Sequence, residues 1–124
     1  NHIIIGSSKN KIKIEKLDVK HGEIKTIGYK INNNIAYIPD VKTIPKKTMK
    51  KILNIKYLII DCFRTSEHNL HINLKETLDY IDLIKPRHAF LTHMSKDLDY
   101  SNLKNKLKKF KNINICYDGM KIKI

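Results

Sequence analysis

The stretch AFLTHMSKDLDY, Ala89 to Tyr100, decides the fold because it joins a strand-like segment directly to a polar loop. Its first four residues, 89–92, have the composition of a strand buried in a sheet. His93 follows at the tip of that strand. Such a histidine is either a loop residue hydrogen-bonded to its own backbone or a metal ligand, since neutral imidazole is the commonest protein ligand for transition metals.

Two other predicted strands also end in an ionisable residue. Asp40 follows AYIP (36–39), and Asp61 follows YLII (57–60). In open α/β sheets, ligands bind at the carboxyl ends of the strands. If the three strands lie side by side, Asp40, Asp61 and His93 line one rim, although aspartate is also common in ordinary turns.

The remaining pattern predicts a strand meander followed by alternating strands and helices. A capping box of Asn73 and Glu76 predicts a helix that stops before Pro86, and Ser101 is the predicted cap of the last helix. A first helix is expected over 46–53, with Pro45 at its first position. The expected strands are 2–6, 11–19, 24–31, 35–38, 57–60, 89–92 and 113–116. This alternation is typical of a layered α/β fold.

Length and composition indicate a soluble domain or part of one. The chain has 124 residues, with no apolar run near the roughly 20 of a membrane span and no basic-then-apolar leader, so we expect a cytoplasmic protein. Cys62 and Cys116 lie far apart in apolar, strand-like surroundings. Reduced cysteines in the core are therefore expected rather than a disulfide.

The net charge of +13 raises the question of nucleic acid. Only Arg64 and Arg87 are arginines among the 25 basic residues, whereas readers of phosphates and bases favour the arginine fork. Lys, Ile and Asn are abundant together, so we expect solvated surface lysines and regard nucleic acid as an unlikely partner. A surface that attracts an anionic substrate remains the alternative.

Three further histidines, His21, His68 and His71, stand near strand ends. Histidines and carboxylates so well separated in sequence suit a site assembled by folding rather than a zinc finger. No cysteine pair has the spacing of a structural zinc site. Oxygen and nitrogen donors of this kind suit Zn²⁺, Mn²⁺ or Fe²⁺.

Five motifs then occur in a fixed order: KHGEIKTIGYKI (20–31), AYIPDVKTIP (36–45), LIIDCFR (58–64) with two following histidines, LTHMS (91–95) and YDGM (117–120). Together, from about Val19 to Met120, they resemble the C-terminal half of a metallo-β-lactamase-fold hydrolase. The nearest group is the phosphodiesterases similar to phosphoribosyl 1,2-cyclic phosphate phosphodiesterase. The resemblance implies a mixed sheet with helices on one face, one half of an αββα sandwich.

The resemblance also implies two divalent metal ions, zinc or manganese, and assigns roles. His21 would bind the first ion and His93 the second, with Asp40 bridging them. His71 would be the general acid near the scissile phosphate, and Asp61 would orient the ligands. The residues alone leave two alternatives open, a turn residue for His21 and a helix-entry residue for His71.

Two basic residues are candidates for substrate binding. Arg64 is placed to contact a phosphate. Lys96 stands where relatives often have a histidine (THMSH); a charged lysine cannot bind metal, but it can hold a phosphate. His68 is expected at the surface or on the substrate side.

The HxHxDH motif that defines the family is missing from the sequence. We therefore expect residues 1–124 to be the C-terminal part of a single domain, with the half that carries this motif outside them. Each ion would then have two protein ligands, fewer than the three of a typical catalytic zinc site. We expect weak or no metal binding and no activity from this chain alone.

Three functions remain open. The first is a metal-dependent phosphodiesterase acting on a small-molecule phosphodiester. The second is a non-catalytic half-domain that self-associates, because an uncovered apolar sheet face needs another copy or an upstream half-domain. The third is an RNA-processing nuclease of the same superfold, which predicts RNA binding with a steep salt dependence.

Overall fold

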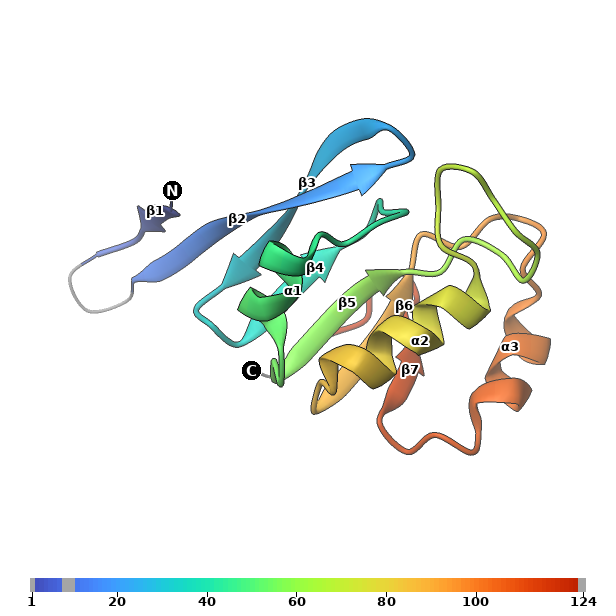
Figure 1. Ribbon diagram of the computed structural model, residues 1–124. Helices are drawn as coiled ribbons and strands as arrows, with labels where there is room; N and C mark the ends of the chain where they lie inside the picture. Colours follow the sequence, from blue (N-terminus) through green and yellow to red (C-terminus); the bar gives the residue numbers. More distant parts are fainter. Residues whose placement is uncertain (1, 8–10, 123–124) are drawn as a thin grey trace.

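The computed structural model describes residues 2–7 and 11–122, which form a seven-stranded sheet and three helices (Figure 1). The strands are β1 (His2–Ile5), β2 (Ile12–His21), β3 (Ile24–Ile31), β4 (Ile35–Ile38), β5 (Tyr57–Asp61), β6 (His88–Thr92) and β7 (Ile113–Ile115). The helices are α1 (Lys46–Ile52), α2 (Leu74–Ile84) and α3 (Tyr100–Leu107). The predicted α/β class is confirmed.

The strands lie in the sheet in the order of the sequence. The pairs from β1 to β4 are antiparallel, and those from β4 to β7 are parallel. Antiparallel neighbours need only short turns, such as the one at Gly22, whose φ is 62°. Parallel neighbours need a crossover, and each of the three parallel pairs is joined by one helix.

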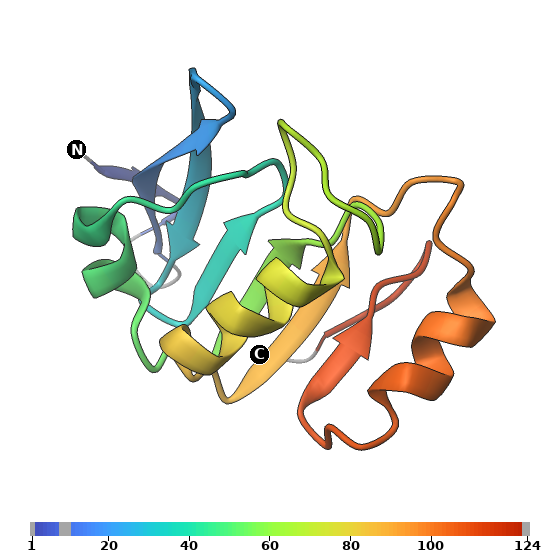
Figure 2. The same ribbon diagram turned by 45° about the vertical axis from the view of Figure 1, so that its right-hand side comes forward.

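The direction of these crossovers explains why the helices share one face. Right-handed crossovers that always step toward the same edge place every helix on the same side of the sheet. Figures 1 and 2 show α1 and α2 lying across one face. On the same side, Leu103 and Leu107 of α3 join the core with Ile113 and Ile115 of β7. The prediction of a mixed sheet with helices on one face is confirmed.

The core lies between this face and the helices. Side chains alternate along each strand, so every second residue points to the helices. The strand residues on this face are almost fully buried: Leu17, Val19, Ala36, Ile38, Leu58, Ile60, Ala89 and Leu91. Burial of these apolar side chains is the main driving force for docking the helices.

The opposite face of the sheet is open and apolar. The strand register places six large side chains on it that are 38–66% exposed: Ile3, Ile5, Ile12, Ile27, Tyr29 and Tyr37. A contiguous patch of this kind is typical of a surface that another segment or chain covers.

Some element boundaries differ from the prediction. Helix α3 is capped by Asp99, whose side chain accepts a hydrogen bond from the backbone N–H of Asn102, and not by Ser101. Pro45 is the N-cap of α1 rather than its first helical residue. Strand β2 extends two residues further than predicted, to His21, which pairs with Ile24 across the turn. Cys62 and Cys116 are free, as predicted.

One edge of the sheet collects the carboxyl ends of five strands, including β7, which is parallel to β6. Strands β4, β5 and β6 are parallel, and β2 has the same direction because two antiparallel pairs separate it from β4. Figure 2 shows the teal, green and orange arrowheads of β4, β5 and β6 at this edge. Within the described ranges, no helix has the length and apolarity that crossing a bilayer requires.

Candidate metal centre

Five side chains from different elements meet at this edge: His21, Asp40, Asp61, His71 and His93. Nε2 of His21 lies 3.2 Å from Oδ1 of Asp40 and 3.0 Å from Nε2 of His71. Nδ1 of His71 lies 2.9 Å from Oδ2 of Asp61. Nδ1 of His93 lies 3.5 Å from the other oxygen of Asp61. These five residues are called the His/Asp cluster below.

Four members of the His/Asp cluster have the spacing of ligands around one ion. One donor atom from each of Asp40, Asp61, His71 and His93 lies within 4.8 Å of all the others. Bonds of about 2.0–2.2 Å in a tetrahedral zinc site separate the ligand atoms by roughly 3.3–3.6 Å. The contacts of Asp61 with His93 and of Asp40 with His71, at 3.5 and 3.4 Å, match this separation.

Two carboxylate oxygens in the cluster lack a hydrogen bond. Oδ1 of Asp40 and Oδ1 of Asp61 are both shielded from solvent, and neither has a hydrogen-bond partner among the described residues. Nε2 of His21 faces the first oxygen at 3.2 Å and Nδ1 of His93 faces the second at 3.5 Å, but a buried carboxylate oxygen left without a hydrogen bond still costs free energy. A divalent cation is a partner that both oxygens would accept, and two carboxylates with imidazoles suit Zn²⁺, Mn²⁺ or Fe²⁺. The residues therefore fit a metal ion.

Burial sets the protonation of the two central groups. Asp61 is completely buried, and this burial raises its pKa to about 7, although the backbone N–H of Val41 at 3.2 Å from Oδ2 opposes the rise. Burial, and then the neighbouring His21, lowers the pKa of His71. A neutral imidazole is the form that coordinates metal ions.

The loop between β5 and α2 holds His71 in place. The ring of Phe63 stacks on His71, with centroids 4.4 Å apart and planes 17° from parallel. The backbone N–H of Ile72 donates to the carbonyl of Val41 at 2.9 Å. Asn73 then starts α2 with the predicted capping box, in which Glu76 returns a hydrogen bond to the backbone of Asn73. These contacts fold the loop back over the ends of β4 and β5.

His93 has an uncommon backbone conformation, with φ of 59°. A left-handed conformation costs energy for a residue with a side chain, and it persists only where neighbouring contacts fix it. Here Cys62 donates its N–H to the carbonyl of Thr92 at 2.9 Å, and Ser95 donates to Phe63 at 2.8 Å. The strain is consistent with a functional position at the end of β6.

Asp40 is brought to His21 by the segment that follows β4. Backbone hydrogen bonds tie this segment to the end of β2: Lys42 donates to the carbonyl of Lys20 at 2.6 Å, and Lys20 donates to that of Thr43 at 2.9 Å. The hydroxyl of Thr26 donates to the carbonyl of Asp40 at 3.2 Å. The turn of β2 and the end of β4 thus meet at the rim.

The structure therefore brings His21, Asp40 and His93 together, with His71 beside them. Asp61 and His71 have donor atoms within 4.8 Å of those of Asp40 and His93. His71 makes contacts through both ring nitrogens, to Asp61 and to His21. The individual roles of ligand, bridge, general acid and orienting residue remain predictions.

Arg64 and Lys96 are not tied to the His/Asp cluster. The guanidinium of Arg64 donates to the backbone carbonyl of Glu67, and Lys96 is exposed. Across residues 2–7 and 11–122, no hydrogen bond or ion pair joins either side chain to the five residues. Their substrate-binding roles remain predictions.

Sequence reasoning gave no weight to Phe63 and little to His68. Phe63 packs on His71, and Nδ1 of His68 accepts hydrogen bonds from the backbone N–H groups of Leu70 and His71, both at 3.2 Å. The sequence feature that could have pointed to Phe63 is its place as an aromatic residue two positions after Asp61. Nothing local distinguishes His68 from a surface histidine.

Comparison with known families shows which family model the chain matches. The model of the β-lactamase superfamily domain matches residues 5–94. A search of curated proteins by sequence finds no match.

Several solved structures have a similar fold, and three of them differ in their degree of similarity to this chain. A diphosphatase from the PhnP family superimposes with a TM-score of 0.85 at 27% identity, over 98% of this chain and 46% of that one. The metallo-β-lactamase fold protein YhfI from Bacillus subtilis gives 0.73 at 19% identity, over 95% and 51%. The short form of human tRNase Z gives 0.65 at 14% identity, over 100% and 47%.

The present chain spans about half the length of these three neighbours. The two with lower identity support the fold alone, while the family model covers most of the chain. The family model and the structural neighbours both agree with the family that the five sequence motifs resemble. The chain belongs to the β-lactamase superfamily and has the metallo-β-lactamase fold of its hydrolases.

Proposed function

We propose that this chain contributes part of the active site of a metal-dependent phosphodiesterase. The observation that carries the proposal is the convergence of two carboxylates and three histidines at one sheet edge, with Oδ1 of Asp40 and Oδ1 of Asp61 shielded from solvent, facing histidine rings and without a hydrogen bond among the described residues. The names of two neighbours, a diphosphatase and a tRNase, support chemistry at phosphate esters.

In this proposal Asp40, Asp61, His71 and His93 hold one divalent cation. When bound, such a cation polarises a phosphoryl oxygen and lowers the pKa of a coordinated water. Asp61 also positions both histidines, because one oxygen faces Nδ1 of His71 and the other faces Nδ1 of His93. Phe63 limits rotation of the His71 ring by stacking on it.

A general-acid role for His71 places a requirement on its ring nitrogens. Nε2 lies 3.0 Å from Nε2 of His21, so the two imidazoles share one proton in this contact. To protonate a leaving group, Nε2 of His71 must carry that proton and turn it toward substrate. Because His71 is also one of the four proposed ligands, a His71 variant should bind the ion more weakly, and loss of turnover at a metal concentration that saturates the variant is the expected signature of the general-acid role.

The geometry changes the expected strength of metal binding. Weak binding was expected because the sequence assigned only two protein ligands to each ion. The spacing of the donor atoms of Asp40, Asp61, His71 and His93, all within 4.8 Å of one another, supports up to four ligands from this chain for one ion. We propose that the chain alone binds one divalent cation, while hydrolysis needs further ligands from outside these 124 residues.

Calorimetric titration of the metal-free chain with Zn²⁺ or Mn²⁺ tests this proposal. One ion per chain is expected, and His93→Ala should weaken binding at least tenfold. His88→Ala is the matched control, because His88 stacks on Tyr57 instead of joining the cluster. Hydrolysis of bis(4-nitrophenyl) phosphate should appear only when the half carrying HxHxDH is added. Equal metal affinity in wild type and His93→Ala would contradict the assignment.

The open sheet face favours a second candidate, a half-domain that self-associates without catalysis. Its exposed isoleucines and tyrosines lie on the face that the helices leave uncovered. This candidate predicts association without metal binding. Metal uptake that depends on His93 would argue against it.

A further inference from the structure

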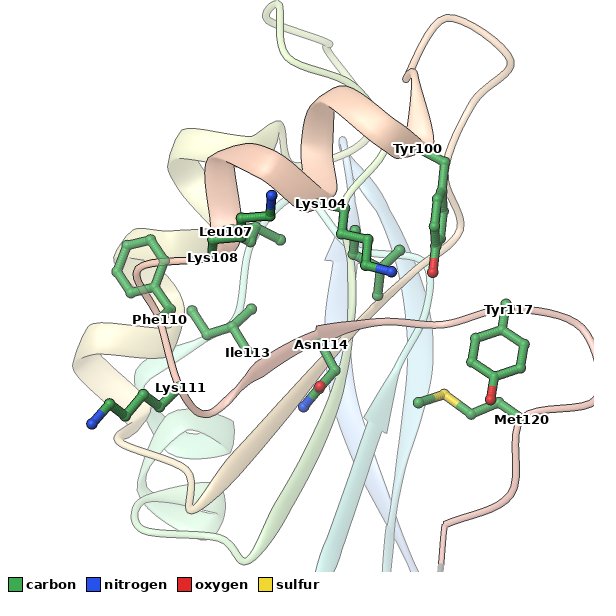
Figure 3. A pocket seen from close by; sticks show the side chains of 11 residues that line it. Tyr100, Lys104, Leu107, Lys108, Phe110, Lys111, Ile113, Asn114, Tyr117 and Met120 are labelled. Carbon is green, nitrogen blue, oxygen red and sulfur yellow. The ribbon is translucent and has the colours of Figure 1, made fainter.

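A groove of about 330 Å³ lies between α3 and β7 (Figure 3). Strand β7 is at the end of the strand order, and its neighbour in the sheet is β6. Tyr100 and Lys104 point from α3 toward Tyr117 and Met120, which follow β7. Residues of β7 line the groove beside them. The groove is separate from the five residues of the His/Asp cluster.

The charge on this groove is of one sign. Lys104, Lys108 and Lys111 line it, and none of the described residues around it is acidic. None of these lysines forms an ion pair within the described part of the chain. By contrast, a smaller hollow at the start of α3 is lined by Asp97 and Asp99 as well as a lysine. Uncompensated lysines along a groove attract an anionic ligand.

The groove also offers flat aromatic surfaces. Tyr100 is 42% exposed and Tyr117 is 59% exposed, while Ile113 and Ile115 are buried beneath. Figure 3 shows the two tyrosines on opposite walls of the same opening. Exposed aromatic rings beside positive charge are the arrangement that binds bases and phosphates of unpaired nucleic acid strands.

The groove continues toward the His/Asp cluster. Tyr117 and Met120 also line a second hollow, whose other walls include Thr92, His93, Cys116 and one acidic residue, Asp118. The two hollows therefore adjoin at Tyr117 and Met120, so that a nucleic acid chain held by the lysines of α3 would reach His93 past the carboxylate of Asp118.

We propose that the α3–β7 groove binds single-stranded nucleic acid and directs it toward His93. Lys104 and Lys108 contact the phosphates, and Tyr117 stacks on a base. Paired bases in a duplex cannot stack on a tyrosine, so the single strand is preferred. Composition argued against nucleic acid because it counts lysines without their positions. The binding of nucleic acid in the groove does not depend on the proposed function, whereas its delivery to His93 rests on that function.

An acidic peptide is the competing occupant, because β7 is an edge strand that an extended peptide could extend. Lysines beside a sheet edge also serve to prevent such pairing. Two exposed tyrosines on facing walls match bases better than they match aspartate or glutamate side chains. The nucleic acid is therefore the better fit, and the peptide becomes an outcome of the test.

Fluorescence anisotropy with a labelled oligouridylate of about 12 nucleotides tests the groove, in EDTA so that hydrolysis plays no part. The slope of log K against log salt should fall by about 1.4 in Lys104→Ala/Lys108→Ala, because each phosphate that a lysine neutralises contributes roughly 0.7. Tyr117→Ala should weaken binding about tenfold. The control Lys46→Ala/Lys50→Ala removes two exposed charges from α1, outside the groove.

The proposal is overturned if the control variant lowers the slope as much as the groove variant, or if Tyr117→Ala binds like wild type. Equal binding of polyglutamate would assign the groove to an acidic peptide instead, and equal binding of a duplex would remove the role of the tyrosines. Circular dichroism checks that each variant is folded. If the oligonucleotide binds in the groove but is not hydrolysed after the half carrying HxHxDH is added, the proposed function is contradicted. The assignment of the groove as a nucleic acid site is then unaffected.

Discussion

Asp61 and His71 form a buried pair in which Oδ2 of the aspartate lies 2.9 Å from Nδ1 of the histidine. Asp61 is 0% exposed and His71 is 8% exposed. The second oxygen of Asp61 lies 3.5 Å from His93. Asp61 therefore connects the loop before α2 with the end of β6, and it stands at the centre of the candidate metal site.

Asp61→Asn should weaken Zn²⁺ binding at least tenfold while the fold is retained. The amide has nearly the same shape and can still accept from Val41, but it carries no negative charge toward the ion. Calorimetric titration measures the loss. Asp79→Asn is the control, since Asp79 is an exposed carboxylate of α2 paired with Lys75. Unchanged affinity in Asp61→Asn would remove Asp61 from the metal site.

Glu15 should govern part of the acid sensitivity of the fold. It bonds Lys51 of α1 at 2.6 Å and pairs with Lys30 of β3 at 3.2 Å, and the Lys51 hydrogen bond is the largest cause that lowers the pKa of Glu15 to about 2. Because the folded pKa lies below the usual 4.5, the stabilisation is present above pH 4.5 and is lost as pH falls toward 2.

Glu15→Gln should therefore lower the free energy of unfolding by about 1 kcal/mol at pH 7 and by much less near pH 2. Urea denaturation at several pH values measures this difference. Asp79→Asn breaks a largely exposed pair on α2 and should cost less. A Glu15→Gln deficit that stays constant from pH 7 to pH 2 would show that the charge is not responsible.

Gly28 should tolerate no larger residue. A methyl group there would lie 2.8 Å from the carbonyl oxygen of Tyr37 and 3.1 Å from the side chain of Ile38. Gly28→Ala is expected to destabilise the fold by roughly 1–3 kcal/mol, because β3 and β4 must separate. Gly119→Ala has open space but a φ of 84°, so its cost of about 1 kcal/mol should come from the backbone alone. Thermal unfolding of both variants compares the loss of stability caused by the steric clash at Gly28 with the loss caused by the positive φ at Gly119.

The open sheet face should drive association of the chain. Ile27 and Tyr29 are 44% and 43% exposed on that face. We expect the apparent mass by sedimentation to rise with concentration, and Ile27→Lys/Tyr29→Lys to reduce that rise, because charge opposes burial of the face. Leu83→Lys is the control, since Leu83 is 61% exposed but belongs to α2. A monomer at every concentration would refute the expectation.

The sequence predicted the elements wherever a local signal was unambiguous. YLII and AFLT are continuous apolar runs between turns, and Asn73 with Glu76 makes a complete capping box. The start of α3 was misplaced because Ser101 and Asp99 are both good N-cap residues within one turn. Local pattern cannot choose between them.

The candidate site was predictable only in part. Asp61 ends β5, and Asp40 and His93 come just after β4 and β6, so their common edge could be read from the order of elements. The central place of His71 depends on the stacking of Phe63 and on the hydrogen bond from Ile72 to Val41, which are contacts made only after folding. The lysines of the α3–β7 groove could be counted in the sequence but not placed.

Binding of one divalent ion by the His/Asp cluster is tested most directly by the visible absorption spectrum of the chain titrated with Co²⁺, whose bands report its coordination. We predict saturation at one ion per chain, with bands that disappear in His93→Ala and Asp61→Asn and persist in His88→Ala. Absorption no different from that of free Co²⁺ would contradict this assignment, as would bands that persist in His93→Ala.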